Sequence, residues 1–132
     1  MDKQEIFNKV AVHLLTQKAQ AGRKEGDAPF ACLYRAPDGK KCAAGCLITD
    51  EAYIPYLEQK TVTSEVVTRA LIKSGVFPDL STREYRDRRD MLAHLQSIHD
   101  GTLVSNWKNA LLNIGELNGL DTSVVKEFHD WP

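Results

Sequence analysis

The residues best suited to chemistry are three cysteines and one histidine–aspartate pair. The cysteines, Cys32, Cys42 and Cys46, all lie in one short stretch of the chain, and His99 and Asp100 follow much later. Zinc prefers cysteine sulfur and histidine nitrogen as ligands, so the three cysteines with one histidine form a candidate zinc set. Nine and then three residues separate the cysteines, which differs from the tight C-x-x-C spacing of many zinc modules.

The same side chains would also suit a small metal-dependent or cysteine-based enzyme. A thiol enzyme needs a cysteine beside a histidine that takes its proton, and a third group that orients the histidine. Cys46 or Cys42 would be the nucleophile and His99 the base, with Asp100 or Asp50 orienting it. The chain contains no G-x-S-x-G, H-E-x-x-H or phosphate-binding glycine loop. The catalytic candidates Cys46, His99 and Asp100 therefore depend on whether the fold brings them together.

The backbone between Cys42 and Cys46 decides what these two thiols can do. On an extended strand their Cα atoms would lie about 13 Å apart, at roughly 3.3 Å per residue, too far for a disulfide or a shared zinc. A helical turn would put both thiols on one side and allow a shared metal. Alanine and cysteine tolerate both conformations, so both stay open. Without any chemistry, the thiols would be small buried residues against which a helix packs closely.

A turn sequence, Pro37–Gly39, lies between two apolar runs. Proline presets φ, aspartate hydrogen-bonds to the local backbone, and glycine accepts the left-handed conformation. We therefore predict a β-hairpin over residues 30–48 with a three-residue loop. In that register Arg35 lies opposite Lys41.

Arg35 and Lys41 would give the hairpin a cationic face. Two positive charges directly opposite each other are unfavourable unless an acidic group neutralises them. That group is either internal or an acidic surface or phosphate on another molecule. Tyr53 and Trp131 would supply the aromatic anchors that binding surfaces favour. The internal acidic candidates are Asp50, Glu51 and Glu58, and the candidate binding residues are Arg35, Lys41, Asp50 and Tyr53.

The residue pattern in most of the remaining chain predicts helices. Apolar residues recur at helical spacing in four segments, and capping residues precede several of them. Residues 22–29 form a polar, glycine-rich loop that we expect to be mobile. The expected fold is a single α+β domain over residues 1–132, mainly helical, with about five helices packed around one hairpin. The expected helices cover about 2–21, 63–75, 81–99 and 103–117, with short turns after Thr49 and Asp121.

Composition narrows the class of protein. The 132 residues suffice for one domain with a buried core, and the formal net charge is −1 from 17 basic and 18 acidic residues. This balance argues against nucleic-acid binding through the overall charge of the protein. A local patch of either charge is compatible with it. No apolar run approaches the roughly 18 residues of a membrane span, and the charged N-terminus is not a secretory signal. Three cysteines without such a signal indicate a reducing cytoplasm.

Two parts of the chain resemble a group of small uncharacterised proteins from bacteriophages and bacterial genomes. The first part contains Tyr34, Arg35, Pro37, Gly39, Lys41, Cys42, Ala43, Gly45, Cys46, Leu47, Ile48, Asp50 and Tyr53. The second contains Leu95, Gln96, Ile98, His99, Asp100 and Trp107. The resemblance implies a phage-type accessory protein. It implies no particular activity, cofactor or catalytic residue.

His99-Asp100 also resembles the paired ligands of metal-dependent HD phosphohydrolases. Those enzymes need an earlier histidine and a later aspartate, for which His13 and Asp121 are the candidates here. His94 and His99 point roughly 140° apart on one helix and cannot easily share a metal.

The interpretation that we favour from sequence is a non-enzymatic protein of a bacterial host's cytoplasm. It would bind a host or defence-system macromolecule, most simply a protein, as an inhibitor or modulator. The alternatives are the small enzyme built on Cys42, Cys46, His99 and Asp100, and a structural zinc module.

Overall fold

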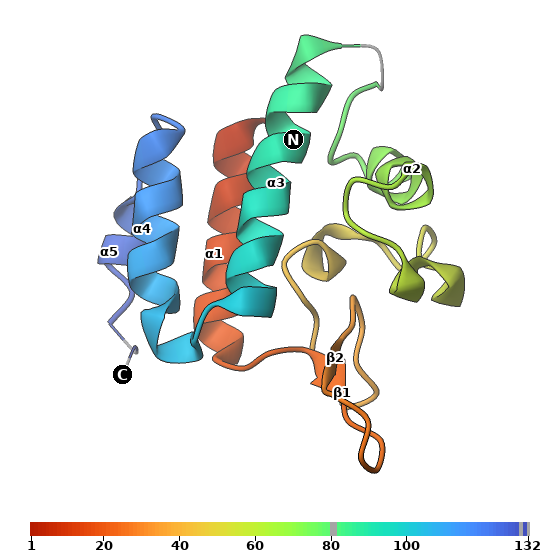
Figure 1. Cartoon of the computed structure of the whole chain (residues 1–132). Helices are drawn as coiled ribbons and strands as arrows, with labels where there is room; N and C mark the ends of the chain where they lie inside the picture. Colours follow the sequence, from red (N-terminus) through yellow and green to blue (C-terminus); the bar gives the residue numbers. More distant parts are fainter. Residues whose placement is uncertain (80–81, 130, 132) are drawn as a thin grey trace.

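In a computed structural model, the described residues form five α-helices and one two-stranded antiparallel sheet (Figure 1). The structure describes residues 1–79, 82–129 and 131. This arrangement confirms the predicted α+β class, mainly helical with a hairpin. In chain order the elements are α1 (Lys3–Gln17), β1 (Gly22–Arg23), β2 (Ala31–Cys32), the 3-10 helices η1 (Gly45–Leu47) and η2 (Pro55–Gln59), α2 (Glu65–Lys73), α3 (Arg83–Gly101), the 3-10 helix η3 (Val104–Asn106), α4 (Trp107–Leu117) and α5 (Ser123–Lys126).

Helix α1 lies at the centre of the helical layer and contacts α3, α4, α5 and η1. It begins with a capping box, in which Asp2 and Glu5 each accept a hydrogen bond from the other's backbone N–H. It ends at Gln17, earlier than predicted, because Lys18 adopts the left-handed conformation with φ 56°. In Figure 1, α1, α3 and α4 run side by side, with η1, η2, α2 and the hairpin to their right. The fully buried stripe of α1 is Ile6, Phe7, Val10, Ala11, Leu14 and Leu15.

The hairpin differs from the one predicted over residues 30–48. The named strands pair Gly22–Arg23 with Ala31–Cys32, so β1 falls in the segment that we expected to be a loop. The Pro37–Gly39 turn does form, and the Ala36 amide donates to the Lys40 carbonyl across it at 2.8 Å. Arg35 and Lys41 form an isolated antiparallel bridge in the predicted register.

After Lys41 the chain coils instead of continuing as a strand. The Cys46 amide donates to the Cys42 carbonyl at 3.1 Å, and η1 follows at once. Of the two conformations left open for these residues, the helical turn is therefore correct. Small side chains make this turn fit, since residues 43–45, two alanines and a glycine, are buried. η1 contacts α1, and the Ala44 amide donates to Gln96 on α3.

The later helices lie close to their predicted positions. Ser64 caps α2 and Thr82 caps α3 through their side-chain oxygens. Ser81, where the helix expected over residues 81–99 would begin, lies outside the described residues. Leu103, the first residue of the helix expected over residues 103–117, is 73% exposed, because the chain forms the separate turn η3 before α4 begins. Trp131 packs partly buried against the core. Within the described ranges, no helix is both long and apolar enough to cross a membrane.

Candidate functional site

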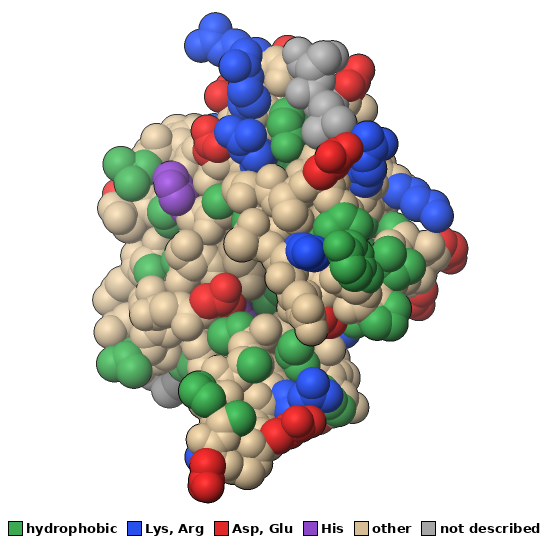
Figure 2. All heavy atoms as spheres, turned by 45° about the vertical axis from the view of Figure 1, so that its right-hand side comes forward, with side chains coloured by type: hydrophobic (Ala, Val, Ile, Leu, Met, Phe, Trp, Pro, Cys, Tyr) green, Lys and Arg blue, Asp and Glu red, His purple; other side chains and the backbone are tan. Residues whose placement is uncertain are grey.

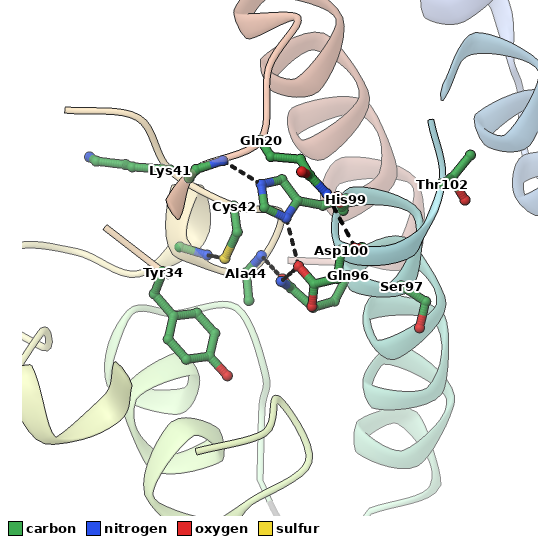
Figure 3. Close-up of polar contacts among 12 residues, drawn as sticks. Gln20, Tyr34, Lys41, Cys42, Ala44, Gln96, Ser97, His99, Asp100 and Thr102 are labelled. Carbon is green, nitrogen blue, oxygen red and sulfur yellow. Dashed lines mark hydrogen bonds and ion pairs between the residues drawn. The ribbon is translucent and has the colours of Figure 1, made fainter. Parts of the chain in front are cut away.

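The last turns of α3 lie against η1 and the hairpin (Figure 3). Gln96 and Asp100 are one helical turn apart on the same side, and Gln96 Nε2 donates to Asp100 Oδ1 at 2.9 Å. Gln96 Oε1 accepts the Ala44 amide at 3.0 Å. A single amide side chain therefore links α3 to the turn that carries the cysteines.

The hydrogen bonds of His99 determine which of its ring nitrogens carries the proton. Its side chain is fully buried, and Nε2 accepts the Ala21 backbone amide at 2.8 Å. Since a neutral imidazole carries one N–H and one lone pair, the proton must be on Nδ1. Nδ1 then donates to Asp100 Oδ1 at 2.6 Å, and the ring packs near Trp107, with centroids 5.8 Å apart. Both ring nitrogens are thus used inside the fold.

This tautomer makes a metal at His99 unfavourable. Among the described residues, Cys32, His99 and Asp100 are the one group of three candidate ligands, with their ligand atoms within 4.8 Å of one another. Coordination through Nδ1 would move the proton to Nε2, where it would face the Ala21 N–H. The remaining two ligands are fewer than the three protein ligands of a catalytic zinc or the four of a structural one.

The predicted zinc set is not assembled in the described part of the chain. Cys42 and Cys46 do not join the group around Cys32. Cys42 Sγ instead accepts the Gly45 amide at 3.3 Å, and Cys46 Sγ donates to the Ala43 carbonyl at 3.1 Å. These local hydrogen bonds favour packed thiols over metal ligands.

All three thiols are poorly prepared to act as nucleophiles. Burial raises the pKa of Cys42 and of Cys46 to about 12. Burial and the nearby Asp100 carboxylate raise the pKa of Cys32 to about 11. His99 cannot serve as their base, because its one lone pair accepts the Ala21 amide. The candidates Cys46, His99 and Asp100 therefore lack the geometry of a thiol enzyme.

Three of the four predicted binding residues come together in one cluster. The Arg35 guanidinium pairs with Asp50 at 2.9 Å, donates to the Ile48 carbonyl at 2.9 Å and stacks over the Tyr53 ring at 4.5 Å. The Tyr53 hydroxyl donates to Glu58 at 2.7 Å. Asp50 thus provides the internal acidic partner that the sequence suggested for Arg35.

Lys41, the fourth predicted binding residue, is held through its backbone. Its amide donates to the Gln17 side chain at 3.0 Å, and its carbonyl accepts from His13 and from Gln17. Its side chain points away from the His99 cluster in Figure 3. Asp121 accepts from Ser123 at the start of α5, so neither His13 nor Asp121 completes an HD-type metal site with His99 and Asp100.

Two hollows open beside these clusters and share Leu33, Glu58 and Gln59. The first, the Asp100 hollow, has a volume of about 470 Å³. The second, the Arg35 hollow, has a volume of about 490 Å³. The Asp100 hollow is lined by Cys32–Tyr34, Glu58–Thr63, Ala93, Gln96, Ser97 and Asp100. The Arg35 hollow is lined by Arg23, Leu33, Arg35–Pro37, Tyr53, Pro55, Tyr56, Glu58 and Gln59.

An exposed apolar segment, Ile54–Tyr56, covers the residue before η2 and the first two residues of η2, and Pro55 and Tyr56 line the Arg35 hollow. Ile54 is 47% exposed and Tyr56 is 59% exposed. The Lys60 ammonium lies 4.8 Å from the centre of the Tyr56 ring. Hydrophobic side chains gather on the right of Figure 2, on the side of the molecule that carries η2 and α2. We call Ile54, Pro55 and Tyr56 the apolar loop.

Sequence reasoning named Glu58 only as one of three internal acidic candidates, and it did not single out the apolar loop. Glu58 receives three hydrogen bonds, from the amides of Tyr34 and Arg35 and the hydroxyl of Tyr53, and this focal role has no local sequence pattern. The apolar loop has a visible one, since three consecutive apolar or aromatic residues, Ile54–Tyr56, are centred on a proline.

No family model, curated protein or solved structure matches this chain.

Proposed function

We propose that this chain is a non-catalytic accessory protein of phage type that binds a host or defence-system protein in the bacterial cytoplasm. The observation that carries the proposal is the exposed apolar loop beside the Arg35 hollow. The resemblance of residues 34–53 to small phage proteins supports the biological setting.

The apolar loop has the features of a contact surface. Interfaces concentrate binding energy in aromatic and arginine side chains that fit pockets. Tyr56 lines the hollow that Tyr53 and Arg35 also line, and the neighbouring Ile54 is exposed. Arg35 forms a salt bridge with Asp50 and stacks on Tyr53, so its side chain is held in place before a partner binds. This order limits the conformational entropy that Arg35 loses on binding.

The state of the thiols and of His99 supports binding over catalysis. An enzyme built on Cys46, His99 and Asp100 would need a histidine lone pair directed at a thiol, and that lone pair accepts a backbone amide. A structural zinc module would need four ligands from the same region.

The proposal is tested by capturing partners from a lysate of the bacterial host. The tagged wild type is compared with the double variant Ile54→Ser/Tyr56→Ser. Both side chains are largely exposed, so the fold should survive the change. We expect a protein captured by the wild type to be lost with this variant. Arg35→Glu is a poorer test, because it also breaks the Asp50 and Tyr53 contacts.

The matched control is Leu117→Ser. Leu117 is 74% exposed on α4, on the opposite side of the molecule from η2 in Figure 1. It should leave capture unchanged. Equal loss with both variants, or a wild type that captures no protein more than a tag-only control, would contradict the proposed surface.

A further inference from the structure

The lining of the Asp100 hollow includes two carboxylates that no lysine or arginine of the described residues neutralises. Its two carboxylates, Asp100 and Glu58, accept hydrogen bonds from neutral donors. Neither forms an ion pair with a lysine or arginine among the described residues. Lys60 also lines the hollow, but its ammonium lies 4.8 Å from the centre of the Tyr56 ring. Tyr56 and Lys60 together line a separate, third hollow towards the start of α2.

Asp100 is held rigidly at the wall of this hollow. His99 Nδ1 and Gln96 Nε2 both donate to its Oδ1, and Gln96 is itself anchored on the Ala44 amide. Figure 3 shows the three α3 side chains gathered at the same end of the helix. The Asp100 side chain remains 42% exposed, so part of it is accessible to a ligand.

The charge of Asp100 acts on the other groups around the hollow. After burial, the Asp100 carboxylate is the next cause that raises the pKa of Cys32, to about 11. Burial also raises the pKa of Tyr34, with contributions from Cys42, Asp100 and Glu58. A negative field stabilises the protonated thiol and phenol, and the same field would stabilise a cation in the hollow.

The other lining groups suit a cation with several N–H donors and an apolar stem. Ser97, Thr61 and Thr63 offer hydroxyl oxygens, while Leu33, Val62 and Ala93 offer apolar surface. The volume of about 470 Å³ falls in the range of roughly 300–1,000 Å³ that is common for ligand sites. A metal ion would find too few ligands, since His99 Nδ1 carries a proton.

We propose that the Asp100 hollow binds the guanidinium group of an arginine side chain presented by the partner protein. A guanidinium is planar, always charged and carries five N–H donors, so it can engage Asp100 and the hydroxyl oxygens together. Its methylene stem would pack against Leu33 and Val62. This inference rests on the proposed function, and it adds the chemistry by which the partner is recognised.

The test is an NMR titration of the ¹⁵N-labelled full chain with two capped tripeptides, Ala-Arg-Ala and Ala-citrulline-Ala. Citrulline has nearly the shape of arginine without its charge. Titration up to about 20 mM detects millimolar dissociation constants. We expect the arginine peptide to shift the backbone amides of Gln96, Ser97 and Asp100, and to bind at least about tenfold more tightly than the citrulline peptide.

The matched variants are Asp100→Asn and Asp87→Asn. The first keeps an acceptor oxygen for His99 and Gln96 but removes the charge, and we expect it to weaken binding of the arginine peptide about tenfold or more. Asp87 is exposed on the same helix and lies outside the hollow, so its variant should bind like the wild type.

Several results would overturn the inference. They are equal binding of the two peptides by the wild type, shifts confined to another surface, no shifts at all, or unchanged binding by Asp100→Asn. If butylguanidinium binds in the hollow and the arginine peptide does not, the site takes a free small molecule and the assignment to a partner is wrong. Partner capture that depends on the apolar loop but survives Asp100→Asn would reject this inference while leaving the proposed function standing.

Discussion

Gly45 packs directly against the backbone carbonyl of Tyr34, so closely that a β-carbon on Gly45 would overlap the carbonyl oxygen. The contact joins the start of η1 to the segment between β2 and the Pro37–Gly39 turn. Because the obstacle is backbone, no side-chain rotation can relieve it. The two halves of the cysteine-rich stretch therefore depend on glycine at position 45.

We predict that Gly45→Ala destabilises the protein by about 1–3 kcal/mol, as inserting a methyl group into a tightly packed site usually does. The measurement is the free energy of unfolding from urea denaturation. Gly101→Ala is the control, because a β-carbon there meets nothing within 4 Å and the residue is in helix α3. It should be neutral or stabilising by up to about 1 kcal/mol. Equal effects of the two variants would contradict the proposed close packing.

His99 should matter for stability in the way expected of a buried hydrogen-bonding residue. His99→Ala would remove the acceptor of the Ala21 amide and leave a cavity beside Trp107. We predict a loss of about 2–4 kcal/mol in the free energy of unfolding.

The control on the same helix is His94→Ala. His94 is exposed, so the change should stay within about 0.5 kcal/mol. A His99→Ala protein as stable as the wild type would show that the Ala21 contact does not support the fold. It would also reopen a chemical role for His99.

Local patterns in the sequence predicted some of these relationships. The Pro37–Gly39 turn fixed its own register because proline, aspartate and glycine each favour one turn position, and the Arg35–Lys41 bridge followed from that register. The charge argument for an acidic partner of Arg35 also pointed to Asp50, which the structure places at 2.9 Å.

Other relationships depend on tertiary packing and have no local pattern. Alanine and cysteine accept strand or helix alike, so only the contact with α3, through Gln96 and Ala44, identifies the coiled path after Lys41. The lone pair of His99 is occupied by an amide 78 residues away in the sequence. The adjacent His99 and Asp100 therefore suggested chemistry that their surroundings do not support.

The thiols give a prediction about reactivity. At pH 8 the rate of alkylation follows the fraction of thiolate, and a rise in the pKa of Cys32 from 9 to about 11 lowers that fraction about a hundredfold. We expect iodoacetamide to modify the folded protein at least about a hundredfold more slowly than the urea-unfolded chain. Cys32 should react first, because Cys42 and Cys46 have higher pKa values, about 12.

Mass spectrometry of the alkylated protein after proteolysis assigns the order of the three sites. Unfolded chain supplies the control, since all three thiols should react at similar rates there. Rapid and selective modification of Cys46 in the folded protein would contradict the buried environment of this thiol. It would favour the cysteine-based enzyme instead.

His13 provides a prediction about pH. Burial, with smaller contributions from Lys41 and His99, lowers the pKa of His13 from its ordinary value of 6.5, although its hydrogen bond to the Lys41 carbonyl acts in the opposite direction. As the pH falls through about 6.5, the unfolded chain takes up a proton at His13 before the folded protein does. At this residue the unfolded state then binds more protons, so the contribution of His13 to the free energy of unfolding decreases between pH 7 and pH 5.

The variant His13→Gln isolates this contribution, because an amide N–H can still donate to the Lys41 carbonyl but does not titrate. We expect the free energy of unfolding of the variant to fall less steeply between pH 7 and pH 5 than that of the wild type, as measured by urea denaturation at each pH. Leu117→Gln is the control, since Leu117 is exposed and the change adds or removes no titrating group, and it should keep the wild-type slope. Parallel slopes for His13→Gln and the wild type would mean that His13 titrates alike in both states, and that its contact with Lys41 leaves the imidazole open to water.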